Sequence, residues 1–228
     1  NNNLLISTPG NSIFPNNESV SSLTGIFNGI IGDTNYDIGH SFTTGSGGAA
    51  YLRSACGTNK GGGTTGLPNP IGDPFAIDYV SHEIGHQLGA THTFNGSAGN
   101  CGTGTRTTAT AYEPGSGSTI MSYAGICSPQ NVQNNSNDYF HQASLRQIWT
   151  NITTGNSTCG ALTVTGNTAP TADAGASYNI PISTPFRLTG SSTDVDGTSS
   201  HTYTWEQFDL GSVGIPTETT EFGPMVRS

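Results

Sequence analysis

The spacing of apolar residues along the chain predicts three amphipathic helices. Apolar side chains recur three or four positions apart over residues 20–31, 73–88 and 137–152, as they do on one face of a helix. The second helix has a typical start at Asp73-Pro74, an N-cap carboxylate followed by a proline in the first turn. The residues expected to face the core are Ile77, Val80, Ile84 and Leu88 in the second helix, and Leu145, Ile148, Trp149 and Ile152 in the third.

Short runs of apolar and small residues before the second helix predict strands. We expect strands at residues 4–6 and 36–43, and a short edge strand within 45–52. Glycine is so frequent over residues 57–72 that this segment is expected to be a loop. Helices and strands mixed in this way indicate an α+β fold for the first part of the chain.

The composition changes after Cys159. Residues 165–171 are small, polar and contain proline, which suits a linker. Beyond it, short alternating segments separated by turn signals predict a small all-β sandwich with Trp205 in its core. We therefore expect a first domain at 1–164, a linker at 165–171 and a sandwich module at 172–228.

The charge balance excludes some classes of partner. The 228 residues carry a formal net charge of −9, with a single lysine and no basic cluster. Binding to nucleic acid or to an anionic membrane is therefore not expected. Hydrophobic runs are too short to cross a membrane, and the polar surface is rich in Asn, Gly, Ser and Thr, a style common in secreted bacterial proteins. We expect a secreted, extracellular monomer whose signal peptide lies outside this sequence.

Four cysteines are present, and none of them forms a C-x-x-C pair. An even number without metal-binding spacing favours two disulfides formed in an oxidising compartment. Three pairings are possible. We favour Cys101–Cys127, which ties the loop after residue 92 to the segment just past residue 121, and Cys56–Cys159 then follows by elimination.

A metal-binding motif dominates the middle of the sequence. It reads H-E-x-x-H-x-x-G-x-x-H from His82 to His92. On a helix, His82 and His86 lie one above the other and can hold one metal ion. Glu83 lies beside them as a base, and Gly89 lets the chain leave the helix so that His92 returns as a third ligand. Three histidines with an open fourth position are typical of catalytic zinc.

This motif is the long zinc-binding consensus of the metzincin metallopeptidases, and the chain resembles that clan over roughly residues 1–160. Ile120-Met121-Ser122-Tyr123 matches its Met-turn. The chain looks most like secreted bacterial peptidases of the reprolysin (adamalysin) type. His92-Thr93-Phe94 is also similar to the pappalysins, and Met121-Ser122-Tyr123 to the serralysins. Thr93 stands where reprolysins usually carry an aspartate.

The resemblance implies an α+β (α/β-like) catalytic domain with a twisted mixed sheet, a zinc helix, a Met-turn and a C-terminal helix. It assigns Met121 as a hydrophobic floor beneath the metal, and it places Tyr123 near the zinc, where the phenol stabilises the oxyanion. A tyrosine that only lines the pocket is the alternative. Leu188-Thr189-Gly190 and Tyr203-Thr204-Trp205 resemble pieces of a PKD-type immunoglobulin-like module. Both domains are shorter than their families, so we expect a fragment at both ends.

The function implied is a secreted zinc endopeptidase that hydrolyses peptide bonds in proteins through a zinc-bound water activated by Glu83. The alternative is a catalytically inactive metzincin-like protein used for binding or adhesion. The presence of Glu83 favours the enzyme, since an inactive protein would be free to lose it. An extended peptide is expected along residues 47–52, with the loop at 124–137 as the wall of the specificity pocket.

The remaining polar residues are expected to have structural roles. His40 is predicted to make a structural hydrogen bond, and His141 and His201 to lie at the surface. Asp78 and Tyr79 are expected to be surface or packing residues of the zinc helix. Asp194 and Asp196 could hold calcium through their carboxylates, but a solvated turn is favoured.

Overall fold

A small mixed sheet forms the centre of the first part of the molecule. The computed structural model describes residues 19–217 and 220–226. Its strands β1 (Ser41–Thr43), β3 (Gly63–Gly66) and β2 (Gly47–Ala50) lie in the order β1-β3-β2. β1 runs parallel to β3, and β2 runs antiparallel to it. The sheet is therefore mixed, as the resemblance implies.

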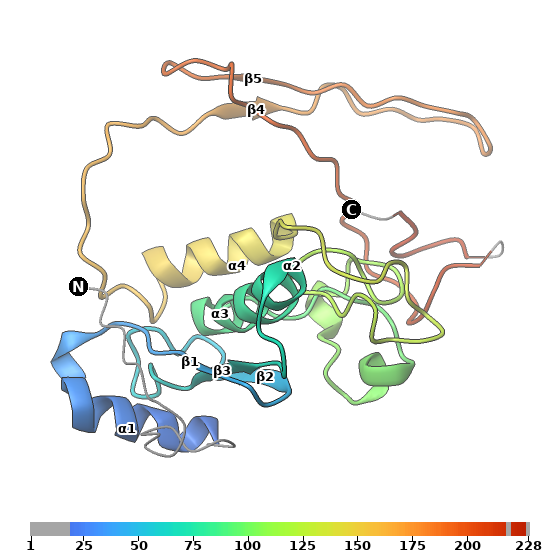
Figure 1. The fold of residues 1–228 in the computed structure, drawn as a ribbon. Helices are drawn as coiled ribbons and strands as arrows, with labels where there is room; N and C mark the ends of the chain where they lie inside the picture. The colour runs from blue at the N-terminus through green and yellow to red at the C-terminus, as the bar shows by residue number, and fades with distance from the viewer. Residues whose placement is uncertain (1–18, 218–219, 227–228) are drawn as a thin grey trace. The chain divides into compact units, whose positions relative to one another are not determined.

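Helices cover both faces of this sheet (Figure 1). Helix α1 (Val20–Ile31) covers one face, and α3 (His82–Leu88) lies on the other, with α4 (Gln142–Thr153) packed on α3. The bounds of α1 are those predicted from its apolar spacing. The strand predicted at 4–6 lies outside the described residues.

The glycine-rich segment expected to be a loop contains the central strand, β3. The reason is close packing of α3 on the sheet. A Cβ added at Gly63 would collide with the side chains of Gln87 and His40, and one added at Gly48 would lie 2.5 Å from a carboxylate oxygen of Glu83. Glycine is needed here for close approach, which composition cannot distinguish from a flexible loop.

The zinc helix begins with an irregular stretch. Helix α2 (Gly72–Phe75) leads into a π-helical turn, Ala76–Ser81, before α3 starts. Asp73 lies exposed in the first turn and is not the N-cap, which is Ile71. Widening of a helix by a π turn is frequent at functional sites, and here it comes directly before the metal-binding motif.

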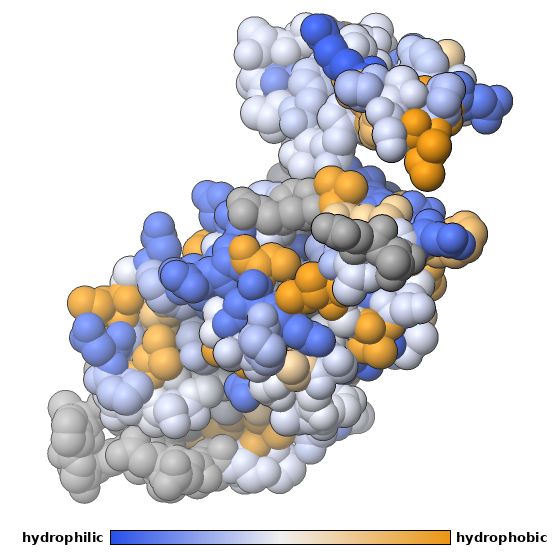
Figure 2. All heavy atoms as spheres, turned by 90° about the vertical axis from the view of Figure 1, so that its right-hand side faces the viewer, coloured by the Kyte–Doolittle hydropathy of each residue, from blue (hydrophilic) through white to orange (hydrophobic). Residues whose placement is uncertain are grey.

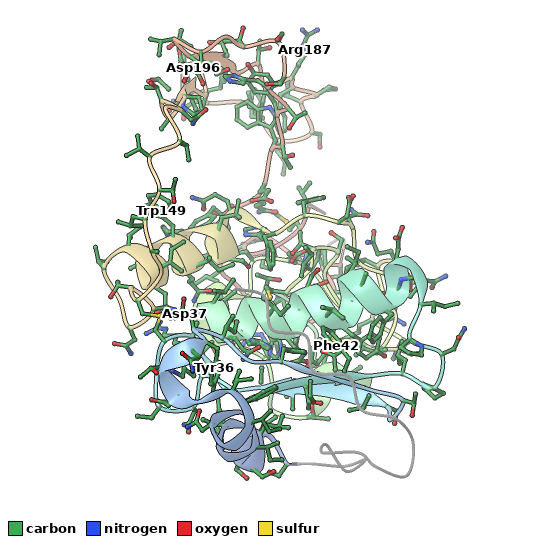
Figure 3. The ribbon with its side chains drawn as sticks, turned by 60° about the vertical axis from the view of Figure 1, so that its left-hand side comes forward. Tyr36, Asp37, Phe42, Trp149, Arg187 and Asp196 are labelled. Atoms are coloured by element: carbon green, nitrogen blue, oxygen red, sulfur yellow. A yellow bond between two sulfur atoms is a disulfide. The ribbon has the colours of Figure 1, made fainter. Side chains whose placement is uncertain are left out.

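Helix α4 follows its predicted packing only in part: Ile148 packs on the apolar cluster of Ala90, Ile120 and Met121, as expected, but other residues of the predicted face do not. It begins at Gln142 instead of residue 137, and Leu145 and Trp149 on the predicted apolar face are 52% and 66% exposed. Trp149 lies on the outer side of the helix, away from α3 (Figure 3). The buried residues are Ala143, Ser144 and Asn151.

Part of the buried side of α4 is polar because it binds the end of α3. Asn151 donates a hydrogen bond to the carbonyl of Leu88 at 2.8 Å, and Gln147 accepts one from the Thr91 backbone at 3.0 Å. Carbonyl groups in the last turn of a helix need partners outside the helix. α4 thus supplies hydrogen-bond partners to the backbone groups of the turn through which the chain leaves α3.

The C-terminal region contains a second compact unit. This unit spans Ala161–Trp205, and the described residues from Glu206 onward group with the first unit. The second unit contains two paired strands, β4 (Thr171–Asp173) and β5 (Ser191–Thr193). No sandwich is formed by its described residues, and Trp205, expected in a core, is 43% exposed.

The segment after Trp205 packs on the first unit through ring stacking and hydrogen bonds. Phe208 stacks on Tyr112 with 4.1 Å between ring centroids. The Gln142 backbone donates to a carboxylate oxygen of Glu206 at 2.7 Å, and Asn95 donates to the Ser212 carbonyl at 2.6 Å. These contacts join residues more than sixty positions apart, so no local pattern could predict them.

Truncation tests this division. A chain that ends at Trp205 is expected to unfold at a lower temperature than the full chain, because Tyr112 loses the ring of Phe208 and Asn95 loses the carbonyl of Ser212. Each lost hydrogen bond costs about 1 kcal/mol. The thermal midpoint measures the effect, and Val195→Ala, an exposed change in the second unit, serves as the control. An unchanged midpoint after truncation would instead support a self-contained module at 172–228.

Figure 2 shows apolar side chains interspersed with polar ones on the face drawn. None of the described helices has the length and apolar character needed to span a bilayer.

Candidate active site

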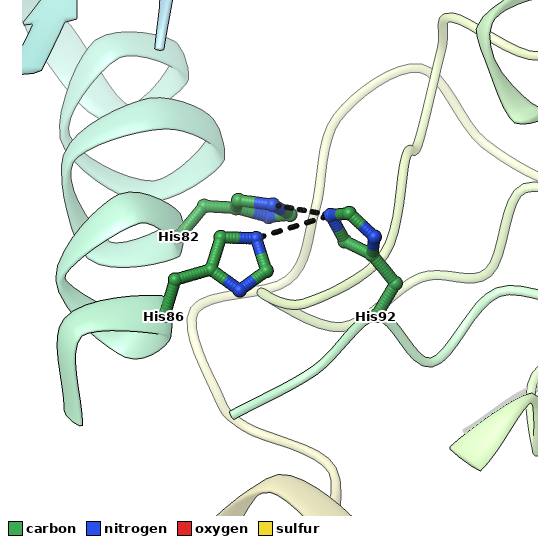
Figure 4. Close-up of side chains that lie close together, drawn as sticks. All are labelled: His82, His86 and His92. Atoms are coloured by element: carbon green, nitrogen blue, oxygen red, sulfur yellow. Dashed lines mark hydrogen bonds between the residues drawn. The ribbon is translucent and has the colours of Figure 1, made fainter. Parts of the chain in front are cut away.

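Three histidine side chains converge beside α3. Nε2 of His92 lies 3.1 Å from Nε2 of His86 and 3.2 Å from Nε2 of His82 (Figure 4). His82 and His86 come from one face of α3, and His92 comes from the chain beyond it. Gly89 makes this return possible because its φ of +117° is in the left-handed region that favours glycine.

Backbone carbonyls determine which ring nitrogen of each histidine carries the hydrogen. The acceptors are the carbonyl oxygens of Ile120 for His82, Ala90 for His86 and Thr105 for His92, at 2.7, 2.7 and 2.6 Å from Nδ1. A carbonyl only accepts, so each Nδ1 donates and each neutral ring directs a bare Nε2 lone pair toward the other two.

This arrangement fits zinc. Three lone pairs that face one another repel unless a cation lies between them. Zn²⁺ binds imidazole nitrogen at about 2.0–2.1 Å in tetrahedral sites, which suits nitrogen atoms separated by 3.1 and 3.2 Å. The carbonyl acceptors are the outer contacts that commonly orient metal-binding histidines.

Burial keeps the three rings neutral, as metal binding requires. It lowers the pKa of His82 well below its usual value, with further lowering by the charges of His86 and His92. Burial also lowers the pKa of His86 below its usual value. It lowers the pKa of His92 to about 4. Unprotonated rings are the form that binds metal.

Glu83 lies next to the histidines and is largely buried. Its side chain is 8% exposed and sits against the backbone of Gly48 in β2. Burial raises the pKa of this carboxyl to about 7. A carboxyl with a pKa near neutrality can both take up and release a proton, which suits acid–base chemistry.

Met121 lies fully buried under α3 in a small apolar cluster with Ala90 and Ile120. Gly85 faces it, and a Cβ at that position would lie 2.5 Å from the Met121 sulfur. The Met-turn therefore packs directly against the helix backbone between His82 and His86.

Tyr123 stands beside the histidines. Its ring centroid lies 4.6 Å from that of His92 and 5.6 Å from that of His82, and it stacks on Phe94 at 4.6 Å. Burial raises the pKa of Tyr123, and a hydrogen bond with Thr105 partly offsets this effect. The phenol is thus protonated near neutral pH and able to donate a hydrogen bond into the site.

Glu113 is a buried acid that sequence reasoning missed. It is fully buried and accepts hydrogen bonds from both sides of the metal site. Thr93, which follows the ligand His92, donates its hydroxyl at 2.6 Å, and the backbone groups of Ser118 and Thr119, just before the Met-turn, donate at 2.7 and 3.0 Å. The carboxylate thus connects the residue after His92 to the Met-turn. No spacing rule in the sequence identifies it.

Removal of this connection should weaken metal binding. Glu113→Ala is expected to lower zinc affinity by about 10–100-fold, as for other outer contacts of metal ligands. Glu113→Gln should recover most of it, because the hydroxyls of Thr93 and Thr119 can turn to accept from the amide. Competition with a chromophoric chelator measures affinity. If the variant destabilised the metal-free protein but left zinc affinity unchanged, the role of Glu113 would be in folding alone.

A cleft of about 610 Å³ opens beside His82 and Glu83. Gly47 and Gly48 of β2 line one side, and β2 pairs with only one of the other described strands. The rest of the lining comes from the segment between β3 and α3, from the Met-turn and from the loops at 100–103 and 124–136. These residues are Leu67, Pro74, Asp78, Tyr79, Asn100, Thr103, Ser122, Tyr123, Ala124, Gly125, Ile126, Asn134, Asn135 and Ser136. The loop expected to form a pocket wall therefore borders the cleft.

Two disulfides hold the segments around the site. Cys101 is bonded to Cys127, and Cys56 to Cys159, the pairs favoured from the sequence. The first joins the two loops of the cleft, where the Asn100 backbone also donates to the carbonyl of Ile126.

The remaining histidines divide into one confirmed prediction and two corrections. Nδ1 and Nε2 of His40 lie 2.7 Å from Gln87 Oε1 and Thr65 Oγ1, so His40 has the structural role predicted. His141 is not at the surface: it is fully buried and accepts from the Ala143 backbone as the N-cap of α4. His201 is partly buried, with Nε2 3.4 Å from Asp194 Oδ2.

The aspartates considered for calcium are held by neighbours in their own unit. Asp194 accepts from the Asp196 backbone at 2.8 Å, and Asp196 accepts from the Thr168 backbone at 2.7 Å. The first contact belongs to the turn that Asp194 begins, and the second joins Asp196 to the segment before β4.

Comparison with known protein families gives one result. The model of a family described as metallo-peptidase family M12B, reprolysin-like, matches residues 11–151, more than half of the chain. The matched region contains the three histidines, Glu83 and the Met-turn. No curated protein and no solved structure matches the chain.

Proposed function

Because this chain belongs to the reprolysin-like metallopeptidase family M12B, we propose that it is a secreted zinc endopeptidase that hydrolyses peptide bonds in proteins. The observation that carries the proposal is the convergence of three unprotonated imidazole nitrogens next to the buried carboxyl of Glu83. The two disulfides are compatible with an extracellular location.

Each residue of the site has a place in hydrolysis. His82, His86 and His92 would hold the zinc, which when bound supplies Lewis-acid polarisation of the scissile carbonyl and lowers the pKa of a coordinated water. Glu83 takes a proton from the attacking water and passes it to the leaving amine. Tyr123 donates its phenol hydrogen toward the oxyanion that develops on the carbonyl.

The substrate would lie as an extended chain along the cleft. β2 has one side free of the other described strands, and Gly47 and Gly48 add no bulk there. A peptide can pair with such an edge through backbone hydrogen bonds, which bind many sequences alike. The scissile bond would then pass Glu83, whose side chain touches Gly48.

Metal removal and return test this function. The purified protein is incubated with a denatured protein mixture, and cleavage products are identified by mass spectrometry. Cleavage is expected to stop when a chelator removes zinc and to resume on return of one equivalent. Cleavage that survives complete metal removal would contradict the proposal. Full zinc occupancy without cleavage would support the alternative of an inactive binding protein.

A further inference from the structure

The cleft contains a carboxylate that this chemistry does not use. Asp78 lies on the π-helical turn before α3 and lines the same cleft as His82 and Glu83. It is half-buried. None of the residues that the structure describes around the cleft is Lys or Arg. The cleft therefore carries acidic side chains and no strongly basic one.

Neutral groups hold Asp78 in place. Its Oδ1 accepts from the Ser136 backbone at 2.6 Å. In the amide orientation that satisfies both of its polar ends, Asn135 donates to Oδ2 at 3.1 Å. Each carboxylate oxygen can accept a second hydrogen bond. The loop contacts thus fix the direction of the carboxylate and leave it able to bind a ligand.

Among the residues that the structure describes, none forms an ion pair with Asp78. The ion pairs among the described residues involve Asp33, Glu206 and Asp194, not Asp78. Burial raises its pKa, and the hydrogen bonds from Ser136 act in the opposite direction. A partly buried carboxylate without a cation is unfavourable, and a cationic ligand would relieve this.

We propose that Asp78 selects substrates with an arginine or lysine side chain next to the scissile bond, so that this side chain enters the cleft and pairs with the carboxylate. The apolar part of such a side chain can lie along Leu67, Tyr79 and Ile126, which line the cleft. The formal net charge of −9 also attracts cationic peptides. This inference rests on the peptidase function proposed above and adds its substrate class.

Matched peptides test the selection. Two series of peptides differ only at the residues flanking the cleaved bond, with Arg or Lys in one and Leu or norleucine in the other. The wild-type enzyme is expected to show kcat/KM about tenfold or more higher for the basic series, as for a charge-assisted hydrogen bond. The preference should decrease as ionic strength rises.

Asp78→Asn removes the charge of this side chain but keeps its contact with the loop, because the amide oxygen can still accept from the Ser136 backbone. The ratio between basic and apolar series should fall to about one in this variant. Asp73→Asn removes the same charge from an exposed position on the same helical segment, outside the cleft, and should keep the ratio. Thermal midpoints of both variants verify folding.

The outcomes distinguish the two proposals. Equal cleavage of both series by the wild type, or a basic preference retained in folded Asp78→Asn, would overturn the selection and leave the peptidase intact. If no peptide is cut by zinc-loaded enzyme, the peptidase function fails, and binding to the zinc-loaded protein is then measured directly. Equal affinity for basic and apolar peptides would overturn the selection there as well.

Discussion

Glu83→Gln is expected to lower kcat by about 10²–10⁴-fold, the usual contribution of a general acid–base group. Glutamine has nearly the same shape as glutamate, so it fits against Gly48, where Glu83 now lies. It cannot accept and release the proton of the attacking water. Steady-state kinetics on a short peptide, together with metal analysis, measure the loss of rate and the zinc content.

Zinc content decides how this result is interpreted. The metal should remain in Glu83→Gln, because the converging nitrogen atoms belong to His82, His86 and His92 and not to residue 83. Asp73→Asn, an acid-to-amide change at an exposed position of the same helical segment, controls for the loss of charge. An empty site, or an unchanged rate, would show that the role of Glu83 is assigned wrongly.

Tyr123→Phe is expected to reduce kcat by at least about tenfold, and by up to about 10²–10³-fold if the phenol acts like other oxyanion donors. The ring contacts with His92 and Phe94 do not depend on the hydroxyl, so folding and zinc content should be retained. KM should change little, since the hydrogen bond is made mainly in the transition state.

Tyr51→Phe provides the matched control, because it removes the same atom from a tyrosine that does not line the cleft. Single-turnover rates at saturating substrate compare the two variants. An unchanged kcat in Tyr123→Phe would reduce this tyrosine to packing. A higher KM alone would make it part of the substrate-binding wall.

The local geometry of the metal site could be predicted from sequence because it depends on one helix. Residues four apart share a helix face, so His82 and His86 had to be neighbours. A glycine at position 89 permits the left-handed turn that is observed. Helix α1 was predicted equally well, because its apolar residues recur at helical spacing over the whole segment.

Packing errors arose where a side chain has two possible environments. The sequence places Leu145 and Trp149 on an apolar face, but α4 turns its small and polar side inward because Asn151 and Gln147 bind the end of α3. Glycine at position 63 resembles a loop residue, yet it is there because Gln87 leaves no room for a Cβ.

The sequence by itself determined the chemistry: which residues can bind zinc, which carboxylate can act as base, and where the helix that presents them ends. Tertiary structure alone decided how that chemistry is held in place. The carbonyls of Ile120 and Thr105 orient His82 and His92, and Glu113 joins the residue after His92 to the Met-turn. The physical reason is the sequence separation between the residues that interact. Helical spacing and turn preferences depend on neighbours within a few residues, whereas a buried polar group is satisfied by whichever distant segment the fold brings to it.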